Sequence, residues 1–271
     1  MSYILNKVIV IIPVYRLTPT DNELKSLMQC FVVLGSRPIC FFCSHDFDTS
    51  FYEELCLKNN IIFRKETFDS KYFISKEGYN DLCLEKKFYS RFRSYEFILI
   101  YQLDAWIFRD DLDYWCNQKY DYLGAAFPID FNAPTDEVEF SVVGNGGFSL
   151  RRVEVIIRVL SRRNHVYNWS QLVEKYAQRA KKNPIYWLYC ILRFMGYRNV
   201  IPRKGKWEDD FFSQIGIYNG EICLPTANEA LRFSFEYKPS AAFKQNGNEL
   251  PMGCHGWDWI EYEEFWKNYI K

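Results

Sequence analysis

An acidic residue interrupts a strongly apolar run in residues 97–108, FILIYQLDAWIF. An ionised carboxylate in apolar surroundings is unfavourable unless it has a cation, a set of hydrogen-bond donors or a path to solvent. Asp104 therefore either faces a ligand where a strand ends, with the apolar run resuming in a second short strand, or caps the turn that follows. Its position alone does not choose between these roles.

Three consecutive acidic residues precede two phenylalanines in residues 206–213, KWEDDFFS. Burial of the two rings would fix Glu208, Asp209 and Asp210 at the start of a helix, where backbone N–H groups favour negative charge. An anchored carboxylate can act as a general base toward a hydroxyl within hydrogen-bond reach. The alternative is an ordinary acidic first turn, which is very common.

One of the three histidines lies among small and aromatic residues, in residues 252–259, MGCHGWDW. A neutral imidazole can bind Mn²⁺ or a similar ion together with a carboxylate and phosphate oxygens. His255 is therefore a candidate metal ligand, and the alternative is a hydrogen-bonded core histidine.

A cluster of three glycines surrounds Asn145 in residues 143–152, VGNGGFSLRR. Glycine permits a positive φ and a close approach of the backbone to a ligand, although the cluster could also be only a tight turn. Residues 228–236, NEALRFSFE, are expected to pack in the core, where Phe233 or Phe235 could line a pocket.

Strand and helix patterns alternate along the chain up to Asp104. Continuous apolar runs such as KVIVIIPV are typical of strands covered on both faces. The alternation predicts a doubly wound α/β domain with a mostly parallel, Rossmann-like central sheet flanked by helices. Because ligands bind beyond the carboxyl ends of such strands, residues 12–16 and 102–104 are expected at one crevice. The predicted strands are residues 7–14, 38–43, 61–65 and the segment before Asp104, and the predicted helices are residues 22–34, 50–60 and 75–93.

Capping signals mark the ends of two of these helices. Thr20 with Glu23 predicts a capping box at the start of the first helix, and Gly35 is expected to end it. Ser50 with Glu53 is expected to cap the second helix in the same way.

The composition excludes several classes of protein. The 271 residues, 48% of them hydrophobic, suffice for one large domain or two small ones, and 34 basic residues balance 34 acidic residues, so no overall field favours nucleic acid. The N-terminal segment MSYILNKVIVIIPVY lacks the features of a signal peptide, and the apolar runs are too short to span a bilayer. A cytoplasmic protein is therefore predicted, with its nine cysteines as reduced core thiols.

Residues 151–206 differ from the rest of the chain because they contain fourteen lysines and arginines and only two acidic residues. They are predicted to form a basic helical insertion within one domain that spans residues 1–271. A solvated helical face is the commonest fate of such a charge run. Basic residues beside an aromatic and aliphatic stretch, residues 185–195, also predict peripheral contact with an anionic membrane, through Arg179, Lys181 and Lys182.

The motifs occur in the order expected of GT-A glycosyltransferases. More closely, LIYQLDAWIF, DYLGAAF, VGNGGFSLR, EDDFFS, FSFE and GCHGW resemble a bacterial and fungal GT-A-like family catalogued as a domain of unknown function. The resemblance extends from Lys7 to Trp259, apart from the basic insertion. It implies a GT-A-like domain that uses a divalent metal, Mn²⁺ or Mg²⁺, to move a sugar from a nucleotide-sugar, above all a UDP-sugar, to a hydroxyl of a glycan or lipid-linked glycan.

The resemblance also implies roles for individual residues on the donor side. Asp104 matches the last aspartate of the metal-binding DxD element, whereas Gln102 stands in place of the first, which leaves the number of protein–metal bonds open. His255 matches a late histidine that completes the metal site in several GT-A families. The residues expected to cradle the nucleoside at the end of the first strand are Pro13, Val14, Tyr15 and Arg16.

On the acceptor side, Gly146 and Gly147, next to Asn145, match the turn near the donor sugar and the acceptor. Glu208, Asp209 and Asp210 match the acidic motif of inverting β-galactosyltransferases, although KGKWEDD replaces GGEDD here. The middle carboxylate, Asp209, is implied to be the general base of a transfer with inversion. Two other functions stay open, a nucleotidyltransferase and a non-catalytic subunit that binds carbohydrate or nucleotide.

Overall fold

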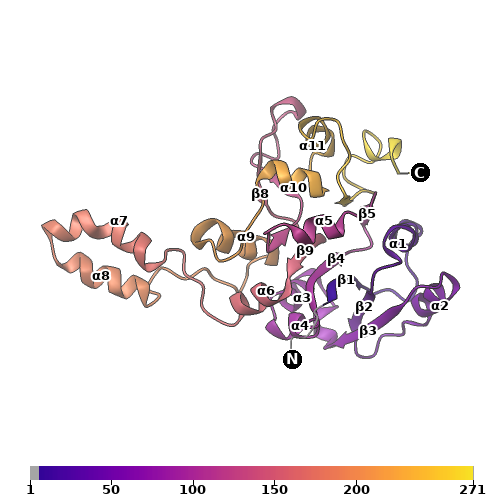
Figure 1. Cartoon of the computed structure of the whole chain (residues 1–271), viewed down its shortest axis with the longest axis horizontal. Helices are drawn as coiled ribbons and strands as arrows, with labels where there is room; N and C mark the ends of the chain where they lie inside the picture. The colour runs from indigo at the N-terminus through magenta and orange to yellow at the C-terminus, as the bar shows by residue number, and fades with distance from the viewer. Residues whose placement is uncertain (1–5, 271) are drawn as a thin grey trace.

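A six-stranded sheet lies at the centre of the computed structural model, which describes residues 6–270 (Figure 1). Residues 1–5, the start of the segment inspected for a signal peptide, and residue 271 lie outside the described part. The strand order is β3-β2-β1-β4-β9-β6. The first four strands are parallel, and β9 is antiparallel to both of its neighbours. The predicted α/β class with a mostly parallel sheet is therefore confirmed. The strands are β1 (Asn6–Pro13), β2 (Ile39–Ser44), β3 (Phe63–Phe68), β4 (Tyr95–Tyr101), β6 (Tyr122–Leu123) and β9 (Phe148–Arg152).

The central strands are apolar because both of their faces are buried. Alternate residues of a strand point to opposite faces, so Ile9 and Ile98 enter one hydrophobic cluster while Val10 and Leu99 enter another. Helices α3, α4, α6 and α9 cover the first face, and helices α1, α2 and α5 cover the second. The bounds are α1 (Asp21–Leu34), α2 (Ser50–Lys58), α3 (Lys76–Cys83), α4 (Lys86–Ser90), α5 (Leu112–Asn117), α6 (Val153–Leu160) and α9 (Glu208–Asn219).

The predicted capping box at the start of α1 is confirmed, whereas the residue predicted to cap α2 is wrong by one position. Thr20 and Glu23 form both hydrogen bonds of a capping box at the start of α1, and Gly35 ends this helix. In α2, Ser50 is the first helical residue and Thr49 precedes it. The Thr49 side chain accepts from no backbone N–H, and its hydroxyl instead donates to the Glu53 carboxylate, so the predicted box does not form there.

The single helix predicted over residues 75–93 is two helices. It begins as α3 and stops at Cys83, and α4 begins at Lys86. Leu82, Cys83 and Leu84 are all buried in the same cluster. Three consecutive residues cannot all lie on one face of a continuous helix, so the break at Leu84 lets each of them enter the core.

Two smaller sheets stand beside the central one. β5 follows β4 in the chain, as predicted, and Asp104 lies in the turn between them. β5 then pairs with β11, and β11 pairs with β10. The remaining elements are β5 (Ala105–Ile107), β7 (Ala126–Pro128), β8 (Phe140–Val143), β10 (Ser234–Phe235), β11 (Gly253–His255), α10 (Ala227–Phe233), α11 (Pro239–Gln245) and the 3₁₀ turns Ser70–Tyr72, Thr135–Glu137 and Trp266–Asn268.

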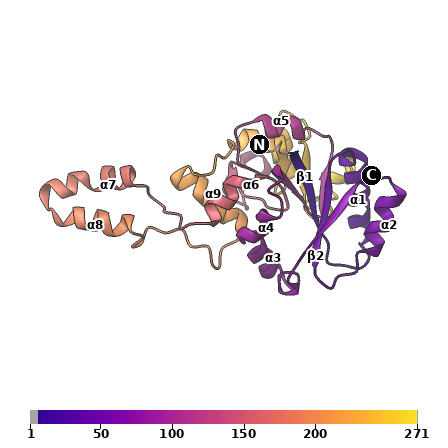
Figure 2. The ribbon, with the colours of Figure 1, turned by 60° about the horizontal axis from the view of Figure 1, so that its bottom comes forward.

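Two helices project from the body as an arm, which both views of the ribbon show (Figures 1 and 2). They are α7 (Trp169–Lys182) and α8 (Ile185–Phe194). A bridge between His165 and Val200 closes the base of the arm, so we call residues 165–200 the arm. The start of the predicted insertion, residues 151–160, instead belongs to β9 and to the largely buried α6. The projecting part is therefore shorter than residues 151–206.

Candidate active site

The structure brings Asp104 and His255 together through strand register. β11 is antiparallel to β5 with His255 opposite Ala105, so Asp104 lies beside the end of β11, where its carbonyl accepts from the Gly256 N–H at 2.8 Å. The Nε2 atom of His255 lies 3.0 Å from the Asp104 carboxylate and 3.0 Å from the Gln102 side-chain oxygen. The two residues predicted as metal ligands and the glutamine predicted beside them are thus in contact.

A second carboxylate, which was not predicted from the sequence, lies on the other side of the same imidazole. Phe235 of β10 pairs with Cys254 of β11, so the next residue, Glu236, lies beside His255. Its Oε1 atom is 2.9 Å from Nδ1 of His255, and its buried Oε2 atom has no hydrogen-bond partner among the described residues. A carboxylate at the end of the apolar, aromatic stretch over residues 228–236 is the sequence signal that could have identified Glu236.

The two carboxylates determine the charge of the histidine. Burial alone would lower the pKa of His255, but the charges of Asp104 and Glu236 and their hydrogen bonds outweigh burial and raise this pKa well above its usual value. Burial would likewise raise the pKa of Asp104, and the nearby His255 lowers it instead. The two carboxylates thus favour the protonated form of the His255 ring.

The two consecutive glycines lie against the side chains of the site. A Cβ atom on Gly147 would lie 2.1 Å from Nε2 of His255, and one on Gly146 would lie 2.1 Å from Oε1 of Glu208. Neither glycine has a positive φ. Glycine is needed here because His255 and Glu208 fill the space that a side chain would occupy, and not because of a left-handed backbone. The neighbouring Asn145 places its amide nitrogen 3.2 Å from Nδ1 of His255.

The acidic triplet occupies the first turn of α9, as predicted, and Phe211 and Phe212 are buried behind it. Glu208 is also buried, and its backbone N–H donates to the side-chain oxygen of Asn80 at 2.6 Å. Its carboxylate accepts a hydrogen bond from the guanidinium of Arg151 at 2.9 Å. Glu208 is therefore held as half of a buried ion pair.

Arg151 is 0% exposed, although it was predicted to lie in the solvated basic insertion. Its guanidinium donates to Glu208, to the Gly146 carbonyl at 3.2 Å, to the Tyr89 hydroxyl at 2.8 Å and to the Ser149 hydroxyl at 3.0 Å. Arg151 thus joins the glycine turn to the acidic triplet. Alternation along β9 turns this residue inward, and a charge count cannot detect that.

The other two acids of the triplet have different surroundings. Asp210 accepts from Lys206 at 3.0 Å and from Gln214 at 2.8 Å. Asp209 has no ion pair with a described residue, and the one hydrogen bond that its carboxylate accepts within the described part of the chain comes from the neighbouring backbone N–H of Asp210 at 2.7 Å. Burial and the charge of Glu208 raise the pKa of Asp209 to about 8. Burial and the neighbouring like charge thus favour the protonated form of Asp209 up to near neutral pH.

The segment predicted to cradle a nucleoside follows β1 at the same edge of the sheet. β1 and β4 are parallel neighbours, so their carboxyl ends bring residues 13–16 next to residues 102–104. Pro13 and Val14 are buried, whereas Tyr15 and Arg16 are exposed. Partial desolvation of the Tyr15 hydroxyl raises its pKa although the side chain is exposed, and the charges of Glu23 and Asp104 raise the pKa further. The Tyr15 hydroxyl thus lies close enough to Asp104 to sense its charge.

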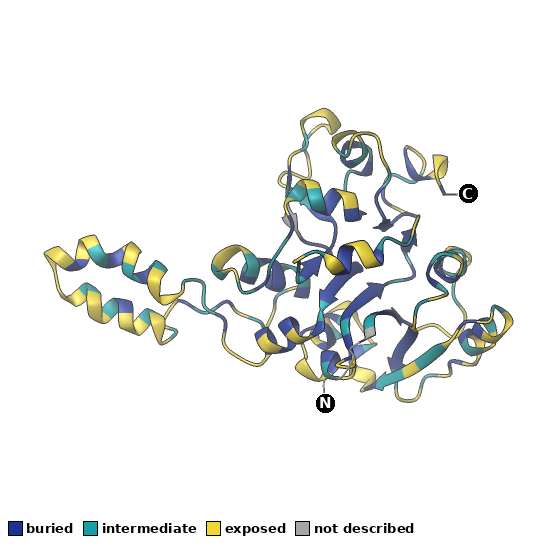
Figure 3. Cartoon of the chain, in the orientation of Figure 1, coloured by how far each residue is buried: buried dark blue, intermediate teal, exposed yellow. Residues whose placement is uncertain are grey.

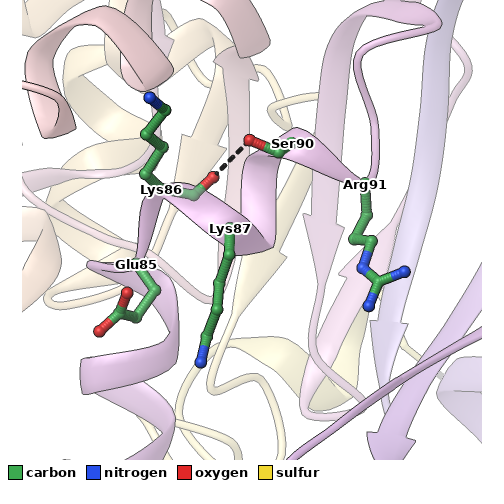
Figure 4. A pocket seen from close by; sticks show the side chains of 5 residues that line it. All are labelled: Glu85, Lys86, Lys87, Ser90 and Arg91. Carbon is green, nitrogen blue, oxygen red and sulfur yellow. Dashed lines mark hydrogen bonds between the residues drawn. The ribbon is translucent and has the colours of Figure 1, made fainter.

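Two predicted pocket residues and one surface hollow lie outside this site. Phe233 and Phe235 are fully buried and pack on Trp115 and Trp266, so neither lines an open pocket. An open hollow of about 490 Å³ lies beside α4. Its side chains point in different directions and not toward a common ligand (Figure 4). They are Glu85, Lys86, Lys87, Ser90 and Arg91.

The donor set of the first cluster suits a hard divalent ion, but the protein supplies few ligands. Among the described residues, no three His, Cys, Asp or Glu side chains are grouped so that they could hold a metal ion. The Asp104 carboxylate and the Gln102 side-chain oxygen each lie 3.0 Å from Nε2 of His255, so the three residues offer oxygen and imidazole ligands at one place. Glu236 on Nδ1 is the type of outer partner that orients a metal-binding histidine. These residues fit an ion that takes its remaining ligands from substrate or water.

Residues 63–255 match the family described as "Protein of unknown function (DUF5672)", so the chain belongs to this family. The resemblance inferred from the motifs is thereby confirmed. A search of curated proteins finds no match.

Several solved structures are similar to this chain at 12–13% identity. They include core-mannan synthase A (CmsA/Ktr4) from Aspergillus fumigatus in an Mn/GDP form, with a TM-score of 0.37 and 48% of this chain and 44% of that chain covered. S. aureus TarS 1–349 has a TM-score of 0.38, with 83% and 63% covered. The galactosyltransferase LgtC, in complex with donor and acceptor sugar analogs, has a TM-score of 0.47, with 91% and 86% covered. The chain thus spans less than two thirds of the first two structures.

Proposed function

We propose that this chain, residues 1–271, is a metal-dependent glycosyltransferase that moves a sugar from a UDP-sugar to a hydroxyl of a glycan or lipid-linked glycan, with inversion. One observation carries the proposal. The consecutive glycines Gly146 and Gly147 pack against Glu208 and His255 respectively. Because neighbouring Cα atoms are 3.8 Å apart, the Glu208 carboxylate and His255 Nε2 are no more than about 11 Å apart. The candidate metal-binding cluster and the acidic triplet that carries Asp209 thus lie against the same pair of glycines, close enough for one sugar to reach both.

In this proposal Asp104, His255 and Gln102 hold a divalent ion, which stabilises the charge that develops on the leaving diphosphate as a Lewis acid. Glu236 keeps the imidazole oriented through Nδ1. Residues 13–16, at the neighbouring strand end, bind the nucleoside, and the exposed Tyr15 and Arg16 are available for this contact.

Asp209 acts on the acceptor. Its carboxylate accepts the proton of the acceptor hydroxyl while that oxygen forms a bond to the anomeric carbon. The bond from this carbon to the diphosphate oxygen breaks, and its electron pair stays on the diphosphate. A single direct displacement by the acceptor oxygen, with Asp209 as the base, inverts the anomeric configuration. A base works best when its pKa is near the working pH, and the pKa of Asp209, raised to about 8, satisfies this condition. Glu208 and Asp210 are already bound to Arg151 and Lys206.

We also propose that the reaction takes place in the cytoplasm. All nine cysteines are free thiols, and eight of them are buried as core residues. Free thiols in such number are typical of a reducing compartment. No helix in residues 6–270 has the length and apolar character needed to cross a membrane.

The test combines binding with turnover. Thermal unfolding is measured with UDP-sugars in the presence and absence of Mn²⁺, since a ligand at 100 times its Kd stabilises by about 2.7 kcal/mol. Release of UDP is then followed in purified protein. We expect Asp104→Asn to abolish Mn²⁺-dependent binding. Asp209→Asn is expected to leave binding intact and to reduce turnover by ~10²–10⁴-fold, and Asp210→Asn serves as the matched control.

Each alternative function predicts a different result. Metal-dependent binding without UDP release, with any acceptor sugar offered, would identify a non-catalytic binding subunit. Formation of a nucleotide-sugar from a sugar phosphate and a nucleoside triphosphate would identify a nucleotidyltransferase. If no UDP-sugar stabilises the protein with or without Mn²⁺, the proposal is wrong.

A further inference from the structure

The arm has a small hydrophobic core of its own. Leu172, Tyr176 and Cys190 form a buried cluster that is separate from the two clusters of the body. The arm therefore does not need its outer surface for packing against the body. Most of that outer surface is exposed (Figure 3).

The outer face of α8 is apolar where a solvated helix would be polar. Ile185, Leu188, Leu192 and Met195 are 61%, 56%, 42% and 71% exposed. Their spacing of three, four and three residues puts them on one face of the helix. This face lies opposite Cys190, the residue that α8 buries against α7. Contiguous exposed apolar patches mark interaction sites in folded proteins.

The charges of the arm are almost all positive. Residues 165–200 contain six lysines and arginines and one acidic residue, Glu174. The last turn of α7, immediately before α8, carries Arg179, Lys181 and Lys182. None of these three has an acidic partner among the described residues. Positive charges at a helix C-terminus also complement the helix dipole, but that role does not explain an apolar face on the next helix.

We propose that the arm attaches the protein to anionic membranes, with the outer face of α8 buried at the boundary between headgroups and acyl chains and with Arg179, Lys181 and Lys182 on lipid phosphates. A short helix with an apolar face and basic flanks lies in the membrane interface without crossing it. The charge selects lipid phosphates over a neutral apolar partner, because each basic residue near an anionic leaflet adds to binding. This inference does not depend on the proposed sugar transfer.

The test is co-sedimentation of the full chain with vesicles of phosphatidylcholine alone or with one third phosphatidylglycerol, at low and high salt. We expect binding to the anionic vesicles only, weakened by salt. Arg179→Glu/Lys181→Glu/Lys182→Glu should lower the partition coefficient on the order of 100-fold, which corresponds to about 1 kcal/mol for each basic residue removed.

A matched control is available for the charge reversal. Lys86, Lys87 and Arg91 are also exposed basic residues on one short stretch, around α4 (Figure 4). They have no exposed apolar face beside them, because Phe88 and Tyr89 are buried. Reversal of these three charges changes the net charge equally and should leave vesicle binding nearly unchanged. An equal loss in both triple variants would overturn the proposal.

The apolar part is tested in the same way. Leu188→Glu/Leu192→Glu should abolish binding, whereas Val32→Glu/Leu57→Glu, at exposed apolar positions of α1 and α2, should not. Circular dichroism checks that each variant is folded. Equal binding to neutral and anionic vesicles, or no binding to either, would overturn the proposal. So would a dimer, seen by light scattering, that Leu188→Glu/Leu192→Glu dissociates without a change in vesicle binding, because the face would then join two copies of the chain.

Discussion

Replacement of Asp209 by asparagine should stabilise the protein relative to the natural protein, and this advantage should grow as the pH rises. Burial and the charge of Glu208 raise the pKa of Asp209 from 3.8 to about 8 in the folded state. An acid whose pKa is raised by folding holds its proton more tightly in the folded than in the unfolded protein. Below the unfolded pKa both states are protonated and the acid costs nothing. Between the two pKa values the unfolded state loses the proton first, so stability falls with rising pH.

The size of the effect has an upper limit. One ionisable group changes stability by no more than about 1.4 kcal/mol per pH unit. Between about pH 5 and pH 8 the limit is thus about 4 kcal/mol. Asp209 is half-buried and its charge is partly screened by solvent. We therefore expect Asp209→Asn to gain about 1–3 kcal/mol over the natural protein across this range.

The assay is urea denaturation followed by circular dichroism at several pH values, with the difference between variant and natural protein as the readout. All other titrating groups contribute equally to both proteins and cancel in this difference. Asp210→Asn is the matched control, because it removes the same charge one residue later, where Lys206 already binds the carboxylate. A difference for Asp209→Asn that stays constant with pH would refute the reasoning and remove the basis for choosing Asp209 as the base.

Three further changes test how the site is held. Arg151→Met leaves a buried carboxylate without its cation and should cost about 3–5 kcal/mol in urea denaturation, while Lys244→Met, at an exposed ion pair, should have no measurable effect. Gly147→Ala places a methyl group against His255, so calorimetry should detect weaker binding of UDP with Mn²⁺ although circular dichroism is unchanged; equal affinity would contradict the packing argument. Glu236→Gln should weaken Mn²⁺ affinity about 10–100-fold, and unchanged affinity would leave this carboxylate without an orienting role.

The sequence predicted the parts of the fold that depend on local pattern. The apolar run that became β1 and the capping box of Thr20 and Glu23 are properties of consecutive residues, and both were predicted at nearly the observed positions. The position of Asp104 between two strands was predicted for the same reason. The predicted helix over residues 75–93 failed because its break depends on which residues the core must bury, and only the tertiary structure determines that.

The contacts of the candidate site are less accessible from the sequence because its residues come from distant parts of the chain. Asp104 and His255 were selected by residue type, but their contact depends on the register of β5 against β11. Glu236 joins them only because β10 lies parallel to β11. Each of these strands has two or three residues. Strands this short carry almost no periodic signal, so their pairing cannot be predicted from pattern.

Arg151 illustrates a different reason for failure. A count of charges over residues 151–206 treats every arginine as equivalent, yet a shift of one position along a strand exchanges the buried and the solvent-facing side. Arg151 is buried with Glu208, whereas the next residue, Arg152, pairs with Asp121 on the partly exposed side of β9. Burial of a cation is unfavourable unless a charge and several acceptors surround it. Glu208, the Gly146 carbonyl and two hydroxyl groups meet this requirement. Glu208 is therefore engaged in its ion pair with Arg151. The neighbouring Asp209 remains available to accept the proton of the acceptor hydroxyl in the proposed reaction.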